Sequence, residues 1–83
     1  MPFTVYILEC ADGSLYTGCT NNIEKRIHAH NHTKTGAKYT LARRPVKMVF
    51  SQAYDSLGAG RKREAEIKRL TRQQKIELIS GTH

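Results

Sequence analysis

Tyrosine, arginine and histidine side chains recur through the first thirty residues at spacings that could gather them into one polar cluster. Tyr6 and Tyr16 lie on either side of Asp12-Gly13, a turn-forming pair, and so would stand on the two arms of a hairpin. Arg26 follows Tyr16 by ten positions and His30 follows Arg26 by four, and residues four apart share one face of a helix. The spacing therefore predicts proton-exchanging and anion-binding groups in one place.

Each of these residues also has an ordinary structural explanation. Tyr6 and Tyr16 could simply be strand aromatics, which are common in sheets. Arg26 could be a solvated helix residue, and the helix dipole could favour His30 near a helix C-terminus. Taken singly the residues leave both interpretations open, and only the ordered set favours a site.

Histidine and cysteine patterns give little support for a metal cluster or a disulfide. His28, His30 and His32 alternate, which suits a strand, and in a helix only His28 and His32 would share a face. Cys10 and Cys19 lie in strand-like contexts without framework spacing, and they are too few to make a zinc site. We expect both cysteines to be reduced, with no disulfide-linked partner.

A hairpin followed by a helix is needed to position the cluster. Alternating β-branched and aromatic residues predict two strands, and apolar residues four apart predict the helix that follows. The expected segments are strands over Phe3 to Cys10 and Leu15 to Thr20, and a helix from an N-cap at Asn21 or Asn22 to about Asn31.

The length of the hairpin loop decides whether the two tyrosines share a face. A two-residue turn would put Tyr6 and Tyr16 on opposite faces, because neighbouring residues of a strand point to opposite sides. A three-residue loop over Ala11-Asp12-Gly13 pairs Leu8 with Tyr16 and brings both rings to one side. That loop needs a residue with positive φ, and Gly13 stands where it is required. We therefore predict the three-residue loop.

The remainder of the chain predicts a third strand and two more helices. The expected segments are a basic loop over His32 to Pro45, a strand over Val46 to Tyr54 with Val46, Met48 and Phe50 on one face, a helix from Leu57 or Arg61 to Leu70, and a capping-box helix from Thr71 to a glycine stop at Gly81. The order β-β-α-β-α-α predicts a single α+β domain over residues 1–83, a three-stranded antiparallel sheet flanked by helices.

The charge balance predicts a polyanionic partner. Fourteen Lys and Arg against seven Asp and Glu give a formal charge of +7, and nucleic acid is the usual partner of such a field. No apolar run is long enough to cross a membrane and no signal-peptide pattern precedes the first strand, so we expect a cytoplasmic protein.

The ordered set resembles the GIY-YIG nuclease domain, and most closely its short stand-alone bacterial members. Val5-Tyr6-Ile7 stands at the first signature triplet, with Val in place of Gly, and Tyr16-Thr17-Gly18 stands at the second. Arg26 and His30 follow at the family offsets, and Glu64 lies on the helix after the third strand. Taken alone, Glu64 could equally form a surface pair with Lys68 four residues later.

The resemblance implies a metal-dependent endonuclease that hydrolyses DNA or RNA, with DNA favoured. Tyr16, assisted by Tyr6 or His30, would deprotonate the attacking water, Arg26 would stabilise phosphoryl charge, and Glu64 would hold one Mg²⁺ or Mn²⁺ ion. The basic residues expected to bind flanking phosphates are Lys34, Lys38, Arg43, Arg44, Arg61 and Lys68.

One departure from the family pattern keeps a second hypothesis open. Many members carry Lys directly after the second triplet, where this chain has Cys19. A lysine there would favour a deprotonated tyrosine nearby. The alternative is therefore a nucleic-acid-binding module with a weak or vestigial catalytic site. The sequence leaves the substrate's structure and the oligomeric state open.

Overall fold

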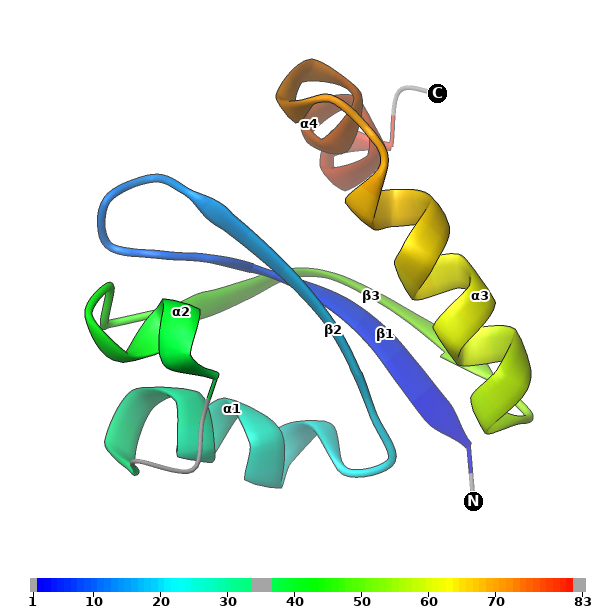
Figure 1. Ribbon diagram of the computed structural model, residues 1–83, viewed down its shortest axis with the longest axis horizontal. Helices are drawn as coiled ribbons and strands as arrows, with labels where there is room; N and C mark the ends of the chain where they lie inside the picture. The colour runs from blue at the N-terminus through cyan, green and yellow to red at the C-terminus, as the bar shows by residue number, and fades with distance from the viewer. Residues whose placement is uncertain (1, 34–36, 82–83) are drawn as a thin grey trace.

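The computed structural model describes residues 2–33 and 37–81. Its strands are β1 (Phe3–Glu9), β2 (Leu15–Thr20) and β3 (Lys47–Tyr54), and its helices are α1 (Ile23–His32), α2 (Lys38–Leu41), α3 (Leu57–Lys68) and α4 (Arg72–Ser80). The strands form one antiparallel sheet in the order β2-β1-β3. Figure 1 shows α1 and α2 on one side of this sheet and α3 and α4 on the other. The predicted α+β architecture and element order are confirmed, with α2 as an addition.

The hairpin of β1 and β2 has the register that the three-residue loop predicts. Leu8 pairs with Tyr16. Gly13 has a φ of 84°, and its N–H donates to the carbonyl of Cys10 at 2.9 Å. A glycine adopts this left-handed conformation at no steric cost. The side chains of Tyr6 and Tyr16 consequently lie on the same face of the sheet, the face that α1 covers.

The pairing of β3 with β1 contains a β-bulge that the sequence did not reveal. Consecutive residues of β1 pair with Phe50 and Met48, so Val49 is an extra residue. The expectation that Val46, Met48 and Phe50 share one face is therefore wrong, because the alternation restarts at the bulge. Phe50 packs toward α3 and α4, whereas Val46 is buried on the α1 side and Met48 is 42% exposed.

Each face of the sheet has its own apolar core. On one face Val5 and Ile7 of β1 pack with Ile67 of α3 and Leu78 of α4. The other face buries Tyr6, Leu8, Cys10 and Val46, with Ile23 and Ile27 of α1 against them. Because β1 is central and contributes to both cores, every residue from Val5 to Leu8 is buried.

Both cysteines are free, as the sequence led us to expect. Cys10 belongs to the core on the α1 side, and Cys19 packs against the core on the α3 side. The sheet therefore separates the two thiols and prevents a disulfide between them.

The predicted start of α1 and both predicted ends of α4 are confirmed, whereas α3 ends at Lys68, two residues before the predicted Leu70. The side chain of Asn22 accepts the backbone N–H of Lys25 at 3.1 Å and caps α1. Thr71 and Gln74 form the capping box of α4, and Gly81 ends that helix with a φ of 78°. Within the described ranges no helix combines the length and the apolar character needed to cross a membrane.

The segment predicted as a loop over His32 to Pro45 contains the short helix α2. Four residues without a side-chain cap leave no periodic pattern for sequence analysis to detect. Arg44 ties the segment to α1: its guanidinium donates to the carbonyl of His30 at 2.6 Å and to the carbonyls of Ala29 and Thr33. Arg44 thus stabilises the C-terminal end of α1, where a cation also complements the helix dipole.

Candidate active site

The ring of Tyr6 lies directly over Gly18, its neighbour on the edge strand β2. A β-carbon on Gly18 would lie 2.6 Å from Cζ of Tyr6 and closer still to the hydroxyl oxygen. No side chain fits there while the tyrosine keeps this position. Gly18 therefore lets the Tyr6 ring reach across β2 toward the free edge of the sheet.

The Tyr6 hydroxyl begins a chain of buried hydrogen bonds. Tyr6 Oη lies 3.0 Å from His30 Nε2, and His30 Nδ1 lies 2.8 Å from Thr40 Oγ1. Thr40 Oγ1 donates its proton to the carbonyl of Ala37 at 2.9 Å. With that proton committed, Thr40 accepts from His30 Nδ1–H, and His30 Nε2 accepts from the Tyr6 hydroxyl. The backbone N–H of Ala37 also lies 3.4 Å from Nδ1, a long contact that as a hydrogen bond would need the other tautomer, with an unprotonated Nδ1; the shorter 2.8 Å contact with Thr40 is the one we assign.

His30 is neutral in this environment and has no contact with solvent. Its side chain is completely buried, and burial lowers the pKa to about 4, with further lowering from the charges of Arg26 and Arg44. A buried imidazole cannot touch a substrate or an attacking water directly. His30 therefore acts as a positioning residue for Tyr6.

Tyr6 stays protonated at neutral pH. Burial raises its pKa to about 12, although the guanidinium of Arg26, close enough to hydrogen-bond to the phenol, opposes part of this rise. The negative charge of Glu64 and the neighbouring Tyr16 raise the pKa further. Arg26 of α1, Tyr16 of β2 and Glu64 of α3 are therefore all within electrostatic reach of the Tyr6 hydroxyl.

Tyr16 is the more accessible of the two tyrosines. Its ring is half-buried and packs edge-on against His30, with centroids 5.3 Å apart. Its other neighbour is Tyr39 of α2, which stacks on it at 5.9 Å and an angle of 27°. Arg43 covers the Tyr39 ring at 4.0 Å from the centroid. No group in the described ranges hydrogen-bonds to the Tyr16 hydroxyl, which leaves it available to a water or a substrate oxygen.

Glu64 approaches the same region from the other face of the sheet. Its carboxylate is 17% exposed and holds the ammonium of Lys68 at 2.8 Å. The negative charge of Glu64 also raises the pKa of the Cys19 thiol, second to the effect of burial. The pairing with Lys68 that the sequence allowed is therefore present, and the same carboxylate lies at the edge of the candidate site.

The donor set at Glu64 fits a hard divalent cation. The carboxylate already attracts one cationic group, Lys68, at its surface. In residues 2–33 and 37–81 no cluster of three or more histidine, cysteine, aspartate or glutamate side chains exists, so a zinc-type cage is not built there. A single carboxylate completed by water and substrate phosphate is a ligand set that Mg²⁺ and Mn²⁺ accept.

Some of the basic residues expected to bind phosphates are engaged in contacts within the protein, and others are exposed. Arg44 is used to cap α1, and Lys68 is paired with Glu64. Arg43 bonds to Asp12 at 3.1 Å and to the carbonyl of Tyr39 at 2.9 Å. Lys38 and Arg61 are exposed on α2 and α3, and Lys34 lies outside the described residues.

Sequence reasoning missed two residues of this region, Tyr39 and Thr40. Both lie on α2, the helix that left no pattern. The only available signal was an aromatic residue, Tyr39, in an otherwise polar segment. Thr40 gave no signal, because a threonine between polar residues does not predict a completely buried hydroxyl.

Comparisons with known proteins agree with this arrangement. The family model described as the GIY-YIG catalytic domain matches residues 2–77. A UPF0213 protein of Syntrophus aciditrophicus is 59% identical over 75 residues, which cover 90% of this chain and 86% of that protein. A UPF0213 protein of Clostridium perfringens is 57% identical over 77 residues, 93% of this chain and 82% of the other.

Two solved structures share the fold. The solution NMR structure of a UPF0213 protein from Bacillus halodurans aligns with a TM-score of 0.62 and 44% identity, over 96% of this chain and 84% of that one. The solution NMR structure of a protein from E. faecalis aligns with a TM-score of 0.67 and 41% identity, over the whole of this chain and 88% of that one.

Proposed function

Since the chain belongs to the GIY-YIG family, we propose that it is an endonuclease that hydrolyses phosphodiester bonds in DNA or RNA with the help of a divalent metal ion. The observation that carries the proposal is that Tyr6 and Tyr16 both pack on the ring of His30, with the charges of Arg26 and Glu64, from two further elements, within electrostatic reach of the Tyr6 hydroxyl. Together they offer a proton acceptor, an anion-binding fork and a metal-binding carboxylate, the three parts that phosphodiester hydrolysis needs.

Tyr16 is the residue we assign to the attacking water. Its hydroxyl has no hydrogen-bond partner in the described part of the chain, whereas the Tyr6 hydroxyl donates to His30. The raised pKa of Tyr6 also makes it a poor proton acceptor at neutral pH. Because its single proton goes to His30, Tyr6 would meet the attacking water only as a hydrogen-bond acceptor, and His30 and Thr40 hold Tyr6 in place.

Arg26 would bind the scissile phosphate. Its guanidinium lies beside the Tyr6 phenol, and its planar fork of donors matches two phosphoryl oxygens at once. The charge that develops on those oxygens in the transition state strengthens the interaction, so Arg26 would lower the barrier as well as bind.

Glu64 would hold the metal ion, whose bound charge would neutralise the leaving oxygen and the phosphate. Lys68 occupies one side of this carboxylate in the protein alone and would be displaced toward the substrate phosphates when the ion binds. Cys19 stands on the sheet face opposite Tyr16. A lysine at position 19 would therefore place its charge near Glu64, not beside the hydroxyl of Tyr16. Its replacement by Cys19 leaves the surroundings of Tyr16 unchanged, which favours an active site over a vestigial one. We place this activity in the cytoplasm.

The test is a cleavage assay with Mg²⁺ or Mn²⁺ over branched, nicked, duplex and single-stranded DNA and RNA. Tyr16→Phe, Arg26→Ala and Glu64→Ala should each reduce kcat by about a hundredfold or more. Excess Mn²⁺ should restore part of the Glu64→Ala activity and none of the Arg26→Ala activity, because only the first variant loses metal affinity.

Tyr54→Phe is the matched control for Tyr16→Phe. Tyr54 is a half-buried tyrosine of β3 in the core on the α3 side, away from the candidate site, so its hydroxyl should be dispensable for cleavage. Cleavage unchanged in Glu64→Ala would refute the metal assignment. Tight binding of nucleic acid without cleavage of any substrate would instead identify a binding module with a vestigial site.

A further inference from the structure

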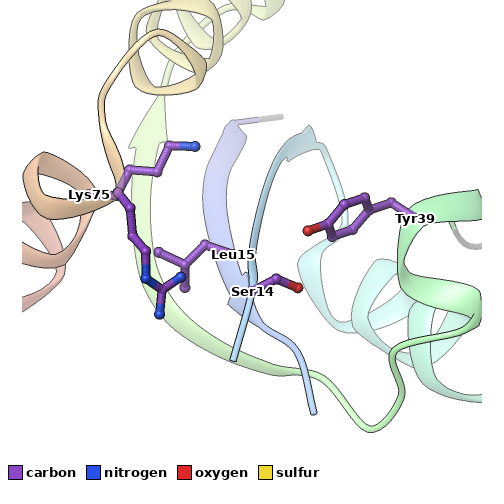
Figure 2. A pocket seen from close by; sticks show the side chains of 5 residues that line it. Ser14, Leu15, Tyr39 and Lys75 are labelled. Atoms are coloured by element: carbon purple, nitrogen blue, oxygen red, sulfur yellow. The ribbon is translucent and has the colours of Figure 1, made fainter. Parts of the chain in front are cut away.

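A small hollow lies on the edge strand β2, next to the candidate active site. It has a volume of about 190 Å³ and is lined by Ser14, Leu15, Tyr39, Arg72 and Lys75. Figure 2 shows Tyr39 approaching from one side of the strand and Lys75 from the other, with Ser14 and Leu15 between them. The Tyr39 hydroxyl points toward the hollow. The lining therefore combines two cations from α4 with hydroxyl groups of the hairpin and α2.

The two cations of the hollow have no acidic partner. Neither Arg72 nor Lys75 forms an ion pair or a side-chain hydrogen bond with any described residue. Lys75 is nevertheless half-buried, a position in which an ammonium group benefits from an anion. Asp12, two residues from Ser14, is occupied by Arg43 and by the hydroxyl and N–H of Ser14. Glu77, two residues from Lys75, forms no ion pair with any described residue. The hollow is thus electropositive and unneutralised.

The hollow and the candidate active site lie along the same free edge of the sheet. Tyr39 lines the hollow and stacks on Tyr16, and Leu15 directly precedes Tyr16 on β2. Gly18, over which the Tyr6 ring lies, is three residues further along β2, about 10 Å at the usual rise of a strand. A nucleic-acid strand that passes the active site along this edge would reach Arg72 and Lys75.

We propose that this hollow binds a backbone phosphate on one side of the scissile bond, with Arg72 and Lys75 as its ligands and the Tyr39 hydroxyl as a further donor. The inference rests on the proposed nuclease function and adds the direction in which the substrate strand leaves the active site. The site is too small and too open to enclose a nucleobase or a cofactor, and its two cations match a single phosphodiester group. Contacts of this kind position the strand without reading its sequence.

The first test measures binding to a fluorescein-labelled DNA oligonucleotide, single-stranded and duplex, without metal and over a series of salt concentrations. Arg72→Gln combined with Lys75→Gln should weaken binding several-fold and reduce the slope of log K against log salt by about one, the contribution of one phosphate contact. The charge-keeping variant Arg72→Lys with Lys75→Arg should restore most of the slope.

Lys62→Gln combined with Arg69→Gln is the matched control. It removes one lysine and one arginine from exposed positions of α3 and its C-terminal cap, residues that have no partner in the described part of the chain. This control should leave the slope close to that of the wild type. An equal loss of slope in both double variants, or no loss in the Arg72/Lys75 variant, would contradict a discrete phosphate site.

The second test locates the phosphate relative to the cleaved bond. In oligonucleotides with one neutral methylphosphonate at a known position, wild-type cleavage should fall when the neutral linkage lies on one side of the bond. The Arg72/Lys75 variant should lose this asymmetry, and a symmetrical wild-type pattern would contradict the inference. The expected change of salt slope without any cleavage would refute the nuclease and leave the phosphate site standing. No binding at all would refute both.

Discussion

His30 is, like Thr40, a completely buried polar residue of the candidate site, and its hydrogen-bond partners bear on which ring nitrogen carries the proton. Thr40 donates to the carbonyl of Ala37 at 2.9 Å, which favours an imidazole that donates from Nδ1 and accepts at Nε2 over the tautomer that the 3.4 Å contact with the Ala37 N–H would need. The Tyr6 hydroxyl is then fixed as a donor to His30. His30 is therefore in a position to orient Tyr6, whereas the family resemblance implied that it could help to deprotonate the attacking water.

His30 should titrate far below its ordinary value, and protein stability should depend on it. The unfolded chain takes up this proton near pH 6.5 and the folded protein near pH 4, so the stabilisation is complete above pH 6.5 and is lost as the pH falls toward 4. Between pH 7 and pH 4 the loss should be about 3 kcal/mol. Urea unfolding of the wild type and His30→Gln at both pH values measures it, since the other titrating groups cancel in the difference.

Ring nitrogen shifts from NMR provide a readout that does not depend on whether His30→Gln folds. They should report a neutral ring protonated at Nδ1 at pH 7. A charged His30 at pH 6, or protonation at Nε2 in the neutral ring, would contradict the hydrogen-bond chain.

Two threonines should respond in opposite ways to the same substitution. Thr17 is buried with a hydroxyl that lacks a partner in the described ranges, whereas Thr40 both accepts and donates. Thr17→Val should stabilise the fold by about 1 kcal/mol by removing an unsatisfied polar group. Thr40→Val should destabilise it by about 2–4 kcal/mol, because His30 and the Ala37 carbonyl both lose a partner. Chemical denaturation at one pH compares the two, and equal destabilisation would show that Thr17 is satisfied after all.

At the scale of elements, the close approach of α3 to the sheet positions Glu64. Gly60 is buried on α3, and a β-carbon there would lie 2.9 Å from Sγ of Cys19 and 3.5 Å from Cβ of Phe3. Gly58, two positions earlier, has open space around it. Gly60 is needed for the close contact between α3 and the sheet, whereas Gly58 is not, although both glycines lower the helix propensity equally.

Alanine substitutions at the two glycines should have different effects on the free energy of unfolding. Gly58→Ala should stabilise the protein by about 0.5–1 kcal/mol through helix propensity. Gly60→Ala should be at least about 1 kcal/mol less stable than Gly58→Ala, because the new methyl group overpacks the contact with Cys19. Adding Cys19→Ala to Gly60→Ala should recover part of the difference, as a double-mutant cycle in urea would reveal. A gain from Gly60→Ala equal to that from Gly58→Ala would mean that α3 has room to move.

The elements that the sequence predicted correctly are those whose signals are local. The hairpin loop follows from Gly13, and the start of α4 follows from Thr71 and Gln74, because turn and cap chemistry acts over three or four residues. The bulge at Val49 and the helix α2 were missed, because tertiary packing rather than local pattern places them. The same holds for the site: the spacing suggested a cluster, but only the fold brings Thr40 to His30.

For the whole molecule, the excess of positive charge should dominate binding. The formal charge of +7 includes Arg72 and Lys75 at the edge of β2, beside the candidate active site. Affinity for a DNA duplex should fall by about a hundredfold between 50 and 200 mM salt, as expected for roughly four phosphate contacts. Fluorescence anisotropy with duplexes of equal length and different sequence measures the salt dependence of the affinity and any preference for sequence. A flat salt response, or strong preference for one sequence, would contradict a phosphate-based interface.

The Tyr6–Gly18 contact has an evolutionary consequence. The ring of Tyr6 occupies the space that any side chain at position 18 would need. Which residues can stand at position 18 therefore depends on which residue stands at position 6. A side chain at position 18 can be accommodated only after Tyr6 has been replaced by a smaller residue. A chain in which Tyr6 is replaced first no longer needs glycine at position 18. Val5 and Thr17, the residues directly before Tyr6 and Gly18, point to the opposite face and are outside this constraint. Substitutions at Tyr6 and Gly18 should therefore be strongly non-additive, which couples one residue of each triplet to the other.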